Sequence, residues 1–102
     1  GKKVYISGEE SFNQVKQRAA RLKITTENLF FLNETNLGTI VATLEKEKPG
    51  LVIVDSIQTI SSASLDGIPG NSSQLRYCTN SLVHFAKHRN VPVFLIGHVT
   101  KD

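Results

Sequence analysis

The sequence predicts an α/β domain with a mostly parallel sheet flanked by helices. Short apolar runs with strand character alternate with amphipathic, helix-like segments along all 102 residues. Such alternation is typical of parallel strands joined by right-handed crossovers. The run at residues 51–54 is apolar at every position, which indicates a strand buried on both faces. The length is sufficient for one domain with a single core.

The N-terminal part predicts a strand, a helix and a second strand. Residues 4–6 are β-prone and end at Gly8, and residues 29–32 form another apolar run. Between them, Ser11 and Gln14 have the spacing of a helix capping box. The apolar residues that follow recur at helical spacing, while the basic residues of the same segment are expected to form a solvated face. The apolar set is Phe12, Val15, Ala19 and Leu22, and the basic set is Lys16, Arg18 and Arg21.

The rest of the chain predicts two more helices and two more strands. A helix capped by Thr35 or Asn36 should end before Pro49, and a strand follows at residues 51–54. Residues 57–70 are rich in Ser, Gly and Pro and are expected to form an extended loop with little order of its own. Asn71 and Gln74 should cap the last helix, which precedes a strand at residues 91–96. The apolar stripes of the two helices are Leu37, Ile40, Val41 and Leu44, and Leu75, Cys78, Leu82, Phe85 and Ala86.

Composition narrows the function classes. The net charge of +3 permits a polyanionic partner without requiring one. No apolar run approaches the ~20 residues of a membrane span, so no membrane association is expected. The single cysteine, Cys78, excludes an internal disulfide and fits a reducing compartment. It lies on an apolar stripe and is expected to be a core residue rather than a nucleophile.

Polar side chains follow three of the predicted strands. Glu9 and Glu10 follow the first, Asp55 and Ser56 the third, and His98 the fourth, with Lys101 just beyond. Parallel strands all end at one edge of the sheet, and ligands bind beyond that edge. We therefore expect carboxylates, an imidazole and an ammonium group to converge there.

These residue types suit phosphate chemistry. The segment LVIVDS has the form of the Walker B strand of phosphate-loop ATPases, in which Asp55 would contact a magnesium ion through its bound water. Glu9 or Glu10 could orient and polarise an attacking water, although Glu10 could instead complement the positive end of the helix dipole. His98 could donate a hydrogen bond to a γ-phosphate or have only a local role. His84 and His88 have zinc-compatible spacing, but no third ligand is near them in the sequence, so no metal site is expected there.

Along its whole length the chain resembles the ATPase domain of the RadA/Sms family of bacterial, RecA-like DNA repair proteins. The segments VYISGEES, PGLVIVDSIQT, PGNSSQLRYC and VPVFLIGHVTKD carry the resemblance. It implies a RecA-like P-loop NTPase core, residues 1–102 being a partial domain. It also implies a bacterial cytoplasmic ATPase that uses Mg²⁺ and ATP, forms hexameric rings on DNA and promotes branch migration, with single-stranded or branched DNA and a recombinase as expected partners.

The resemblance also assigns residue roles. Glu9 and Glu10 correspond to the water-activating glutamates and Asp55 to the magnesium aspartate, while Ser56, His98 and Lys101 would sense the nucleotide. The DNA-facing loop would include Gln58, Ser61, Ser62 and Gln74, although residues 57–70 contain no Lys or Arg to neutralise phosphates.

One family element is missing from these residues. The chain contains no G-x-x-x-x-G-K-[ST] phosphate loop, which the family carries upstream together with a zinc-binding segment. The isolated chain is therefore expected neither to bind ATP tightly nor to hydrolyse it. A KaiC-like or DnaB-like RecA-fold ATPase and a catalytically inert α/β interaction module remain alternative interpretations.

Overall fold

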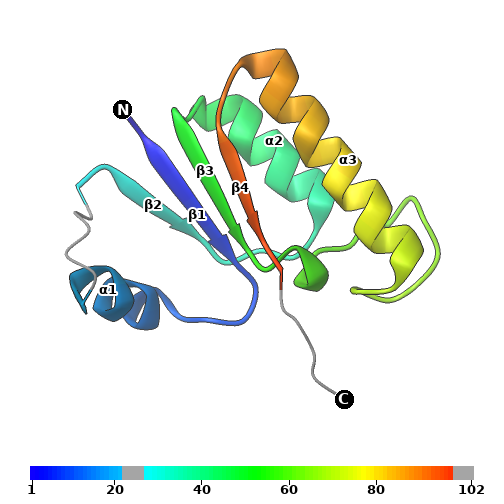
Figure 1. Ribbon diagram of the computed structural model, residues 1–102, viewed down its shortest axis with the longest axis horizontal. Coiled ribbons are helices and arrows are strands. Elements are labelled where there is room, and N and C mark those ends of the chain that lie inside the picture. The colour runs from blue at the N-terminus through cyan, green and yellow to red at the C-terminus, as the bar shows by residue number, and fades with distance from the viewer. Residues whose placement is uncertain (22–26, 98–102) are drawn as a thin grey trace.

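The computed structural model describes residues 1–21 and 27–97, which form one parallel sheet with helices packed against it (Figure 1). The order of the strands in the sheet is β2-β1-β3-β4, and every neighbouring pair is parallel. This confirms the predicted α/β class. The strands are β1 (Lys3–Ser7), β2 (Leu29–Leu32), β3 (Leu51–Asp55) and β4 (Val93–Ile96), and the helices are α1 (Phe12–Arg21), α2 (Leu37–Glu47), the 3-10 helix η1 (Ile57–Thr59) and α3 (Ser72–Arg89).

Helices α2 and α3 cover one face of the sheet and build the core with it (Figure 1). Alternate residues of β1 and β3 point into this core and are at most 2% exposed. The apolar stripes predicted for α2 and α3 supply the opposing side chains, including Cys78, which is fully buried. Burial raises the pKa of the Cys78 thiol, as expected for a core cysteine rather than a nucleophile. The strand residues in the core are Val4, Ile6, Val52 and Val54.

The helix starts follow the predicted capping chemistry. Asn36 caps α2 by accepting a hydrogen bond from the Thr39 amide, and Asn71 caps α3 in the same way from the Gln74 amide. At α1 the Ser11 hydroxyl accepts from the Gln14 amide while the Gln14 side chain accepts from the Ser11 amide. These bonds fix where each helix begins relative to the preceding strand.

The opposite face of the sheet is covered only in part. Tyr5 and Phe31 point to this side, where their rings stack 6.3 Å apart, and Phe12 of α1 packs on Phe31 at 5.6 Å. Phe12 is still 44% exposed, so it lies at the margin of the stripe in which Val15 and Ala19 are buried. Further along this face, Phe94 and Ile96 of β4 are 58% and 40% exposed. Within the described residues, no helix is long and apolar enough to cross a membrane.

The segment after β3 is more ordered than predicted. It contains η1, and Ile57 and Ile60 are buried in the core. Ser61 then pairs with the start of α2, because its amide donates to the Thr35 carbonyl and its carbonyl accepts from the Leu37 amide. The expectation of a loop with little order was wrong for this first part, because two apolar residues among the serines provide burial.

Candidate functional site at the carboxyl edge of the sheet

The ends of β1 and β3 lie side by side. The sheet register pairs Ser7 with Asp55, and Asp55 with Ile96 of β4. Glu9 and Glu10 follow β1 at this edge, and Ser56 follows β3 through a cis peptide bond. The predicted residues His98 and Lys101 lie outside the described residues.

The turn after β1 is held by the buried hydroxyl of Ser7. This side chain is 1% exposed and accepts hydrogen bonds from the amides of Glu9 at 3.4 Å and Glu10 at 3.1 Å. Gly8, in the same turn, fits against Thr35 and Thr59 because it has no side chain. A β-carbon at this position would lie 2.4 Å from the Thr35 methyl group and 3.3 Å from the Thr59 hydroxyl. The backbone that presents both glutamates is therefore packed closely against two neighbouring segments.

Gly8→Ala is accordingly expected to lower the free energy of unfolding by about 1–3 kcal/mol, because the added methyl group overpacks the site. Urea denaturation followed by circular dichroism measures this. Gly1→Ala is the matched control, because a β-carbon on Gly1 has no atom within 4 Å. Equal midpoints for Gly8→Ala and the unmodified chain would contradict the close packing.

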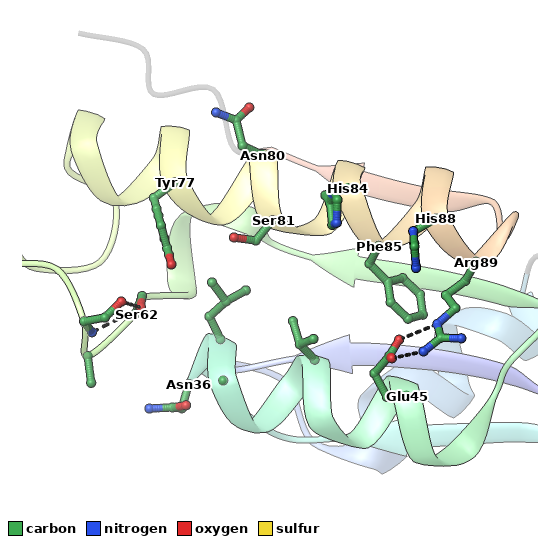
Figure 2. Close-up of a pocket in the computed structure, with 15 residues that line it drawn as sticks. Asn36, Glu45, Ser62, Tyr77, Asn80, Ser81, His84, Phe85, His88 and Arg89 are labelled. Atoms are coloured by element: carbon green, nitrogen blue, oxygen red, sulfur yellow. Dashed lines mark hydrogen bonds and ion pairs between the residues drawn. The ribbon is translucent and has the colours of Figure 1, made fainter.

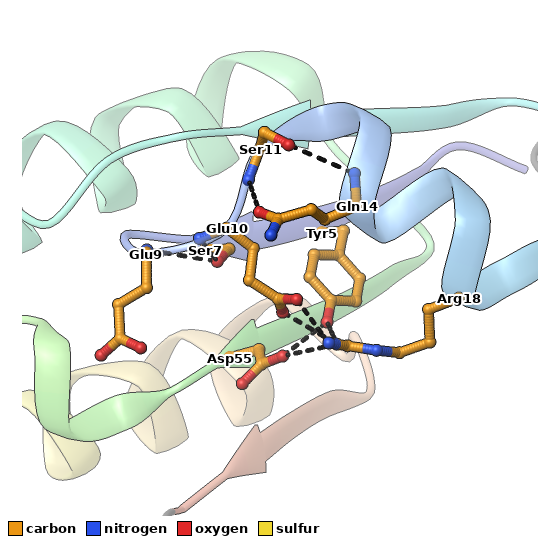
Figure 3. A network of polar contacts seen from close by, with 8 residues as sticks. All are labelled: Tyr5, Ser7, Glu9, Glu10, Ser11, Gln14, Arg18 and Asp55. Atoms are coloured by element: carbon orange, nitrogen blue, oxygen red, sulfur yellow. Dashed lines mark hydrogen bonds and ion pairs between the residues drawn. The ribbon is translucent and has the colours of Figure 1, made fainter.

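A four-residue polar network joins α1 to the strand ends (Figure 3). Arg18 of α1 donates to both carboxylate oxygens of Glu10, from Nη1 at 2.8 Å and from Nη2 in a shorter contact. The same Nη1 lies 3.3 Å from Asp55 Oδ2 and 3.3 Å from the Tyr5 hydroxyl oxygen. Tyr5 in turn donates to Asp55 Oδ2 at 2.6 Å. Two acidic side chains that are far apart in the sequence thus contact one guanidinium group.

The electrostatics of this network are coupled. Partial burial, the hydrogen bond to Asp55 and the negative charge of that carboxylate together raise the pKa of Tyr5 to about 12, and burial contributes most. The hydrogen bond to Glu10 raises the pKa of Arg18. Tyr5 is therefore a neutral hydrogen-bond donor and Arg18 a permanent cation near physiological pH.

Glu9 lies outside this network. Its side chain is exposed, and Figure 3 shows its carboxylate directed away from Glu10 and Arg18. Among the described residues it makes no side-chain hydrogen bond or ion pair; only its backbone amide is engaged, by Ser7. The two adjacent glutamates therefore differ in their side-chain contacts, a difference that could not be predicted from the sequence.

The sequence prediction missed Arg18 and Tyr5 as members of the site. Arg18 was expected on a solvated helix face, and the side chain is indeed 47% exposed, but its guanidinium group contacts both carboxylates. The alternation along β1 gave a signal for Tyr5, because it lies between the buried Val4 and Ile6 and must point to the other face. Nothing in the helix periodicity distinguished Arg18 from Arg21.

Asp55 and Ser56 suit a hydrated magnesium ion. The Asp55 side chain is 12% exposed at the end of β3. The Ser56 side chain is 2% exposed, and its hydroxyl has no hydrogen-bond partner in the part of the chain that the structure describes. A buried hydroxyl without a partner is costly, and a carboxylate and a hydroxyl are oxygen donors of the kind that magnesium and its water shell bind. These residues fit the ion, whereas the sequence holds no glycine-rich loop for the phosphates.

Four residues were predicted to face DNA, and the prediction was wrong for Gln74 because its side chain is buried. Gln74 is 1% exposed, and its side-chain oxygen accepts from the Ser62 amide at 2.8 Å. Its side-chain nitrogen donates to the carbonyls of Ser62, Leu65 and Gly67. It therefore orders the loop from inside, because a buried amide must satisfy its own donors and acceptors. Gln58, Ser61 and Ser62 are partly exposed, and their contact with DNA stays a prediction.

A groove of about 940 Å³ lies between α2 and α3, and residues 62–64 also line it (Figure 2). An ion pair between Glu45 and Arg89 crosses one end of it, and the rings of His84 and His88 stack 5.6 Å apart along its α3 side. Residues 1–21 and 27–97 contain no group of three His, Cys, Asp or Glu side chains placed to hold a metal ion. Of the predicted site residues that the structure describes, only Ser62 lines this groove.

The parallel sheet, with helices packed against it, is the α/β core that the sequence predicted. The chain belongs to the family described as the AAA domain, which matches residues 1–102 in full. It is 50% identical to the DNA repair protein RadA of Aquifex aeolicus over 100% of this chain, and 44% identical to that of Bacillus subtilis over 97%. The predicted resemblance to RadA is confirmed.

The chain covers 23% of the Aquifex aeolicus protein and 22% of the Bacillus subtilis protein, so it spans about a quarter of the length of these relatives. Among solved structures, the KaiC-like protein of Pyrococcus horikoshii matches with a TM-score of 0.63 at 14% identity, over 92% of this chain and 48% of that one. This match supports the fold.

Proposed function

We propose that this chain is part of the ATPase motor domain of a RadA/Sms-like DNA repair protein, in which ATP hydrolysis is coupled to DNA binding and branch migration. One observation carries the proposal. Glu10 lies after β1 and Asp55 is the last residue of β3, yet both contact Arg18 at the carboxyl edge, where parallel α/β proteins bind their ligands. An inert interaction module would have no use for this convergence.

The residues divide into two tasks. Asp55, with Ser56 beside it, would hold a hydrated magnesium ion, which when bound would neutralise charge on the β- and γ-phosphates. Glu9 or Glu10 would orient the attacking water and accept its proton. His98 and Lys101, one and four residues beyond Gly97, are proposed to sense the nucleotide together with Ser56.

The proposed partners follow from the relatives that are named DNA repair proteins. DNA, single-stranded or branched, would contact the surface that includes Gln58, Ser61 and Ser62. Because residues 57–70 lack Lys and Arg, other parts of a hexameric ring would supply most of the phosphate contacts. A recombinase partner, a cytoplasmic location and a zinc-binding segment in another part of the protein complete the proposal.

The proposal is tested by comparing the 102-residue chain with the complete protein that contains it. We expect the chain alone to show no binding of a fluorescent ATP analogue below millimolar concentration and no ATP turnover, because it has no G-x-x-x-x-G-K-[ST] loop. The complete protein should hydrolyse ATP in the presence of Mg²⁺, and faster with DNA. Micromolar ATP affinity of the chain would contradict the first part, and a complete protein without ATPase activity would contradict the proposed function.

A further inference from the structure

We infer that Arg18 is a positioning residue that holds Glu10 beside Asp55 and leaves Glu9 as the carboxylate that contacts the attacking water. This inference rests on the proposed ATPase function and assigns separate tasks to the two adjacent glutamates. Three observations carry it: the contacts of Glu10, the freedom of Glu9 and the position of Arg18 between two acidic residues.

Glu10 has both carboxylate oxygens engaged. Arg18 donates to one from Nη1 at 2.8 Å and to the other from Nη2. A guanidinium group paired in this two-point manner fixes the carboxylate plane and engages one lone pair on each of the two oxygens. The Glu10 backbone is held as well, because its amide donates to Ser7 and its carbonyl accepts from the Asn33 side chain at 3.3 Å. Glu10 is therefore built into the scaffold.

Glu9 has the opposite character. Its backbone amide is anchored to the buried Ser7 hydroxyl, so the position of its α-carbon is fixed relative to β1. In the part of the chain that the structure describes, its side chain makes no hydrogen bond or ion pair, and it is directed away from the network (Figure 3). An anchored backbone with an unengaged carboxylate is what a general base requires, because the base must reach a water rather than a protein donor.

Arg18 also balances the charge at the edge. Its Nη1 contacts Glu10 and Asp55 at the same time, so these carboxylates lie within reach of one nitrogen atom. Without the cation, the negative charges of Glu10 and Asp55 would face each other, and the Asp55 side chain is only 12% exposed. The two carboxylates would then move apart, and the turn between Ser7 and Ser11, which carries Glu9, would move with Glu10. Arg18 thus acts on the reaction through the geometry of this turn.

The test uses ATP hydrolysis by the complete protein, with the turnover number, KM and affinity for a fluorescent ATP analogue measured for each variant. Glu9→Gln is expected to lower the turnover number about 100-fold or more with ATP affinity unchanged. Arg18→Met and Glu10→Gln should each lower the turnover number about 10-fold, because the turn that carries Glu9 is misplaced. The double variant should be no slower than the slower single variant, because the two substitutions remove the same interaction. Arg18→Lys should recover part of the loss. Arg89→Met is the control, because it removes a comparable two-point pair, with Glu45, that lies away from this edge.

A second measurement is independent of catalysis. In urea denaturation of the 102-residue chain, the midpoint shifts of Arg18→Met and Glu10→Gln should be non-additive, and those of Arg18→Met and Glu9→Gln additive. Equal coupling of Arg18 to both glutamates would overturn the inference. So would an active protein in which Glu10→Gln lowers turnover as much as Glu9→Gln, or in which Arg18→Met has no effect. An unmodified complete protein that binds ATP without hydrolysing it would instead overturn the proposed function and, with it, the role of Glu9.

Discussion

Asp55→Asn in the complete protein is expected to lower the turnover number for ATP by about 100-fold or more, because an amide cannot supply the negative charge that a hydrated magnesium ion requires. Asn keeps the shape of the side chain and an oxygen that can accept the hydrogen bond from Tyr5, which is 2.6 Å long in the unmodified chain. The fold should therefore survive. Initial rates of phosphate release at several Mg²⁺ concentrations measure the effect.

The dependence on Mg²⁺ separates a metal role from a structural one. If Asp55 serves the ion, the half-saturating Mg²⁺ concentration should rise in Asp55→Asn, whereas a structural defect would lower turnover equally at all concentrations. Glu47→Gln is the matched control. Glu47 is also an acidic residue paired with a cation, Lys2 at 2.9 Å, but it lies at the opposite edge of the sheet. Full activity of Asp55→Asn at the Mg²⁺ concentration used by the unmodified protein would remove Asp55 from the site.

The elements of this fold follow from local features of the sequence. Periodicity placed the strands at residues 4–6 and 29–32 within two residues of β1 and β2, because side-chain alternation and helical spacing are properties of short segments. The caps at Ser11, Asn36 and Asn71 were equally local, since each bond joins residues three positions apart. The convergence of strand ends followed from the parallel topology alone.

The long-range contacts at the edge did not follow from such features. Arg18 meets Asp55 only because β1 and β3 are neighbours and α1 crosses the face to which Tyr5 points. Three basic residues shared that helix face, and helical spacing gave no reason to prefer one of them. The distinction between Glu9 and Glu10 also depends on where this one guanidinium group lies.

The ordered conformation of the loop after β3 could not be predicted from the sequence for a related reason. Its composition of Ser, Gly and Pro is typical of a mobile segment, but its conformation is set by a residue beyond it in the sequence. Gln74 lies in the first turn of α3 and is 1% exposed, so it was not recognisable as a loop contact. Four hydrogen bonds of its side chain join it to the backbone of Ser62, Leu65 and Gly67.

Gln74→Leu is therefore expected to lower the free energy of unfolding of the chain by about 2–4 kcal/mol. Leucine fits the buried volume but leaves the Ser62 amide and three carbonyls without their partner, and each unsatisfied buried group costs about 1–3 kcal/mol, less where water can enter. Urea denaturation measures the loss, and hydrogen exchange at the Ser62 amide should accelerate before the chain unfolds globally.

Gln14→Leu is the control for this prediction, because it makes the same substitution at an exposed position where the side chain accepts one hydrogen bond, from the Ser11 amide. Its cost should stay below about 1 kcal/mol, as for the loss of one exposed capping bond. If the two variants shift the midpoint equally, the hydrogen bonds of Gln74 do not stabilise the loop. If Gln74→Leu destabilises the chain without accelerating exchange at Ser62, the residue supports the core rather than the loop. The surface proposed to meet DNA is then ordered by η1 and by the buried side chains of Ile57 and Ile60.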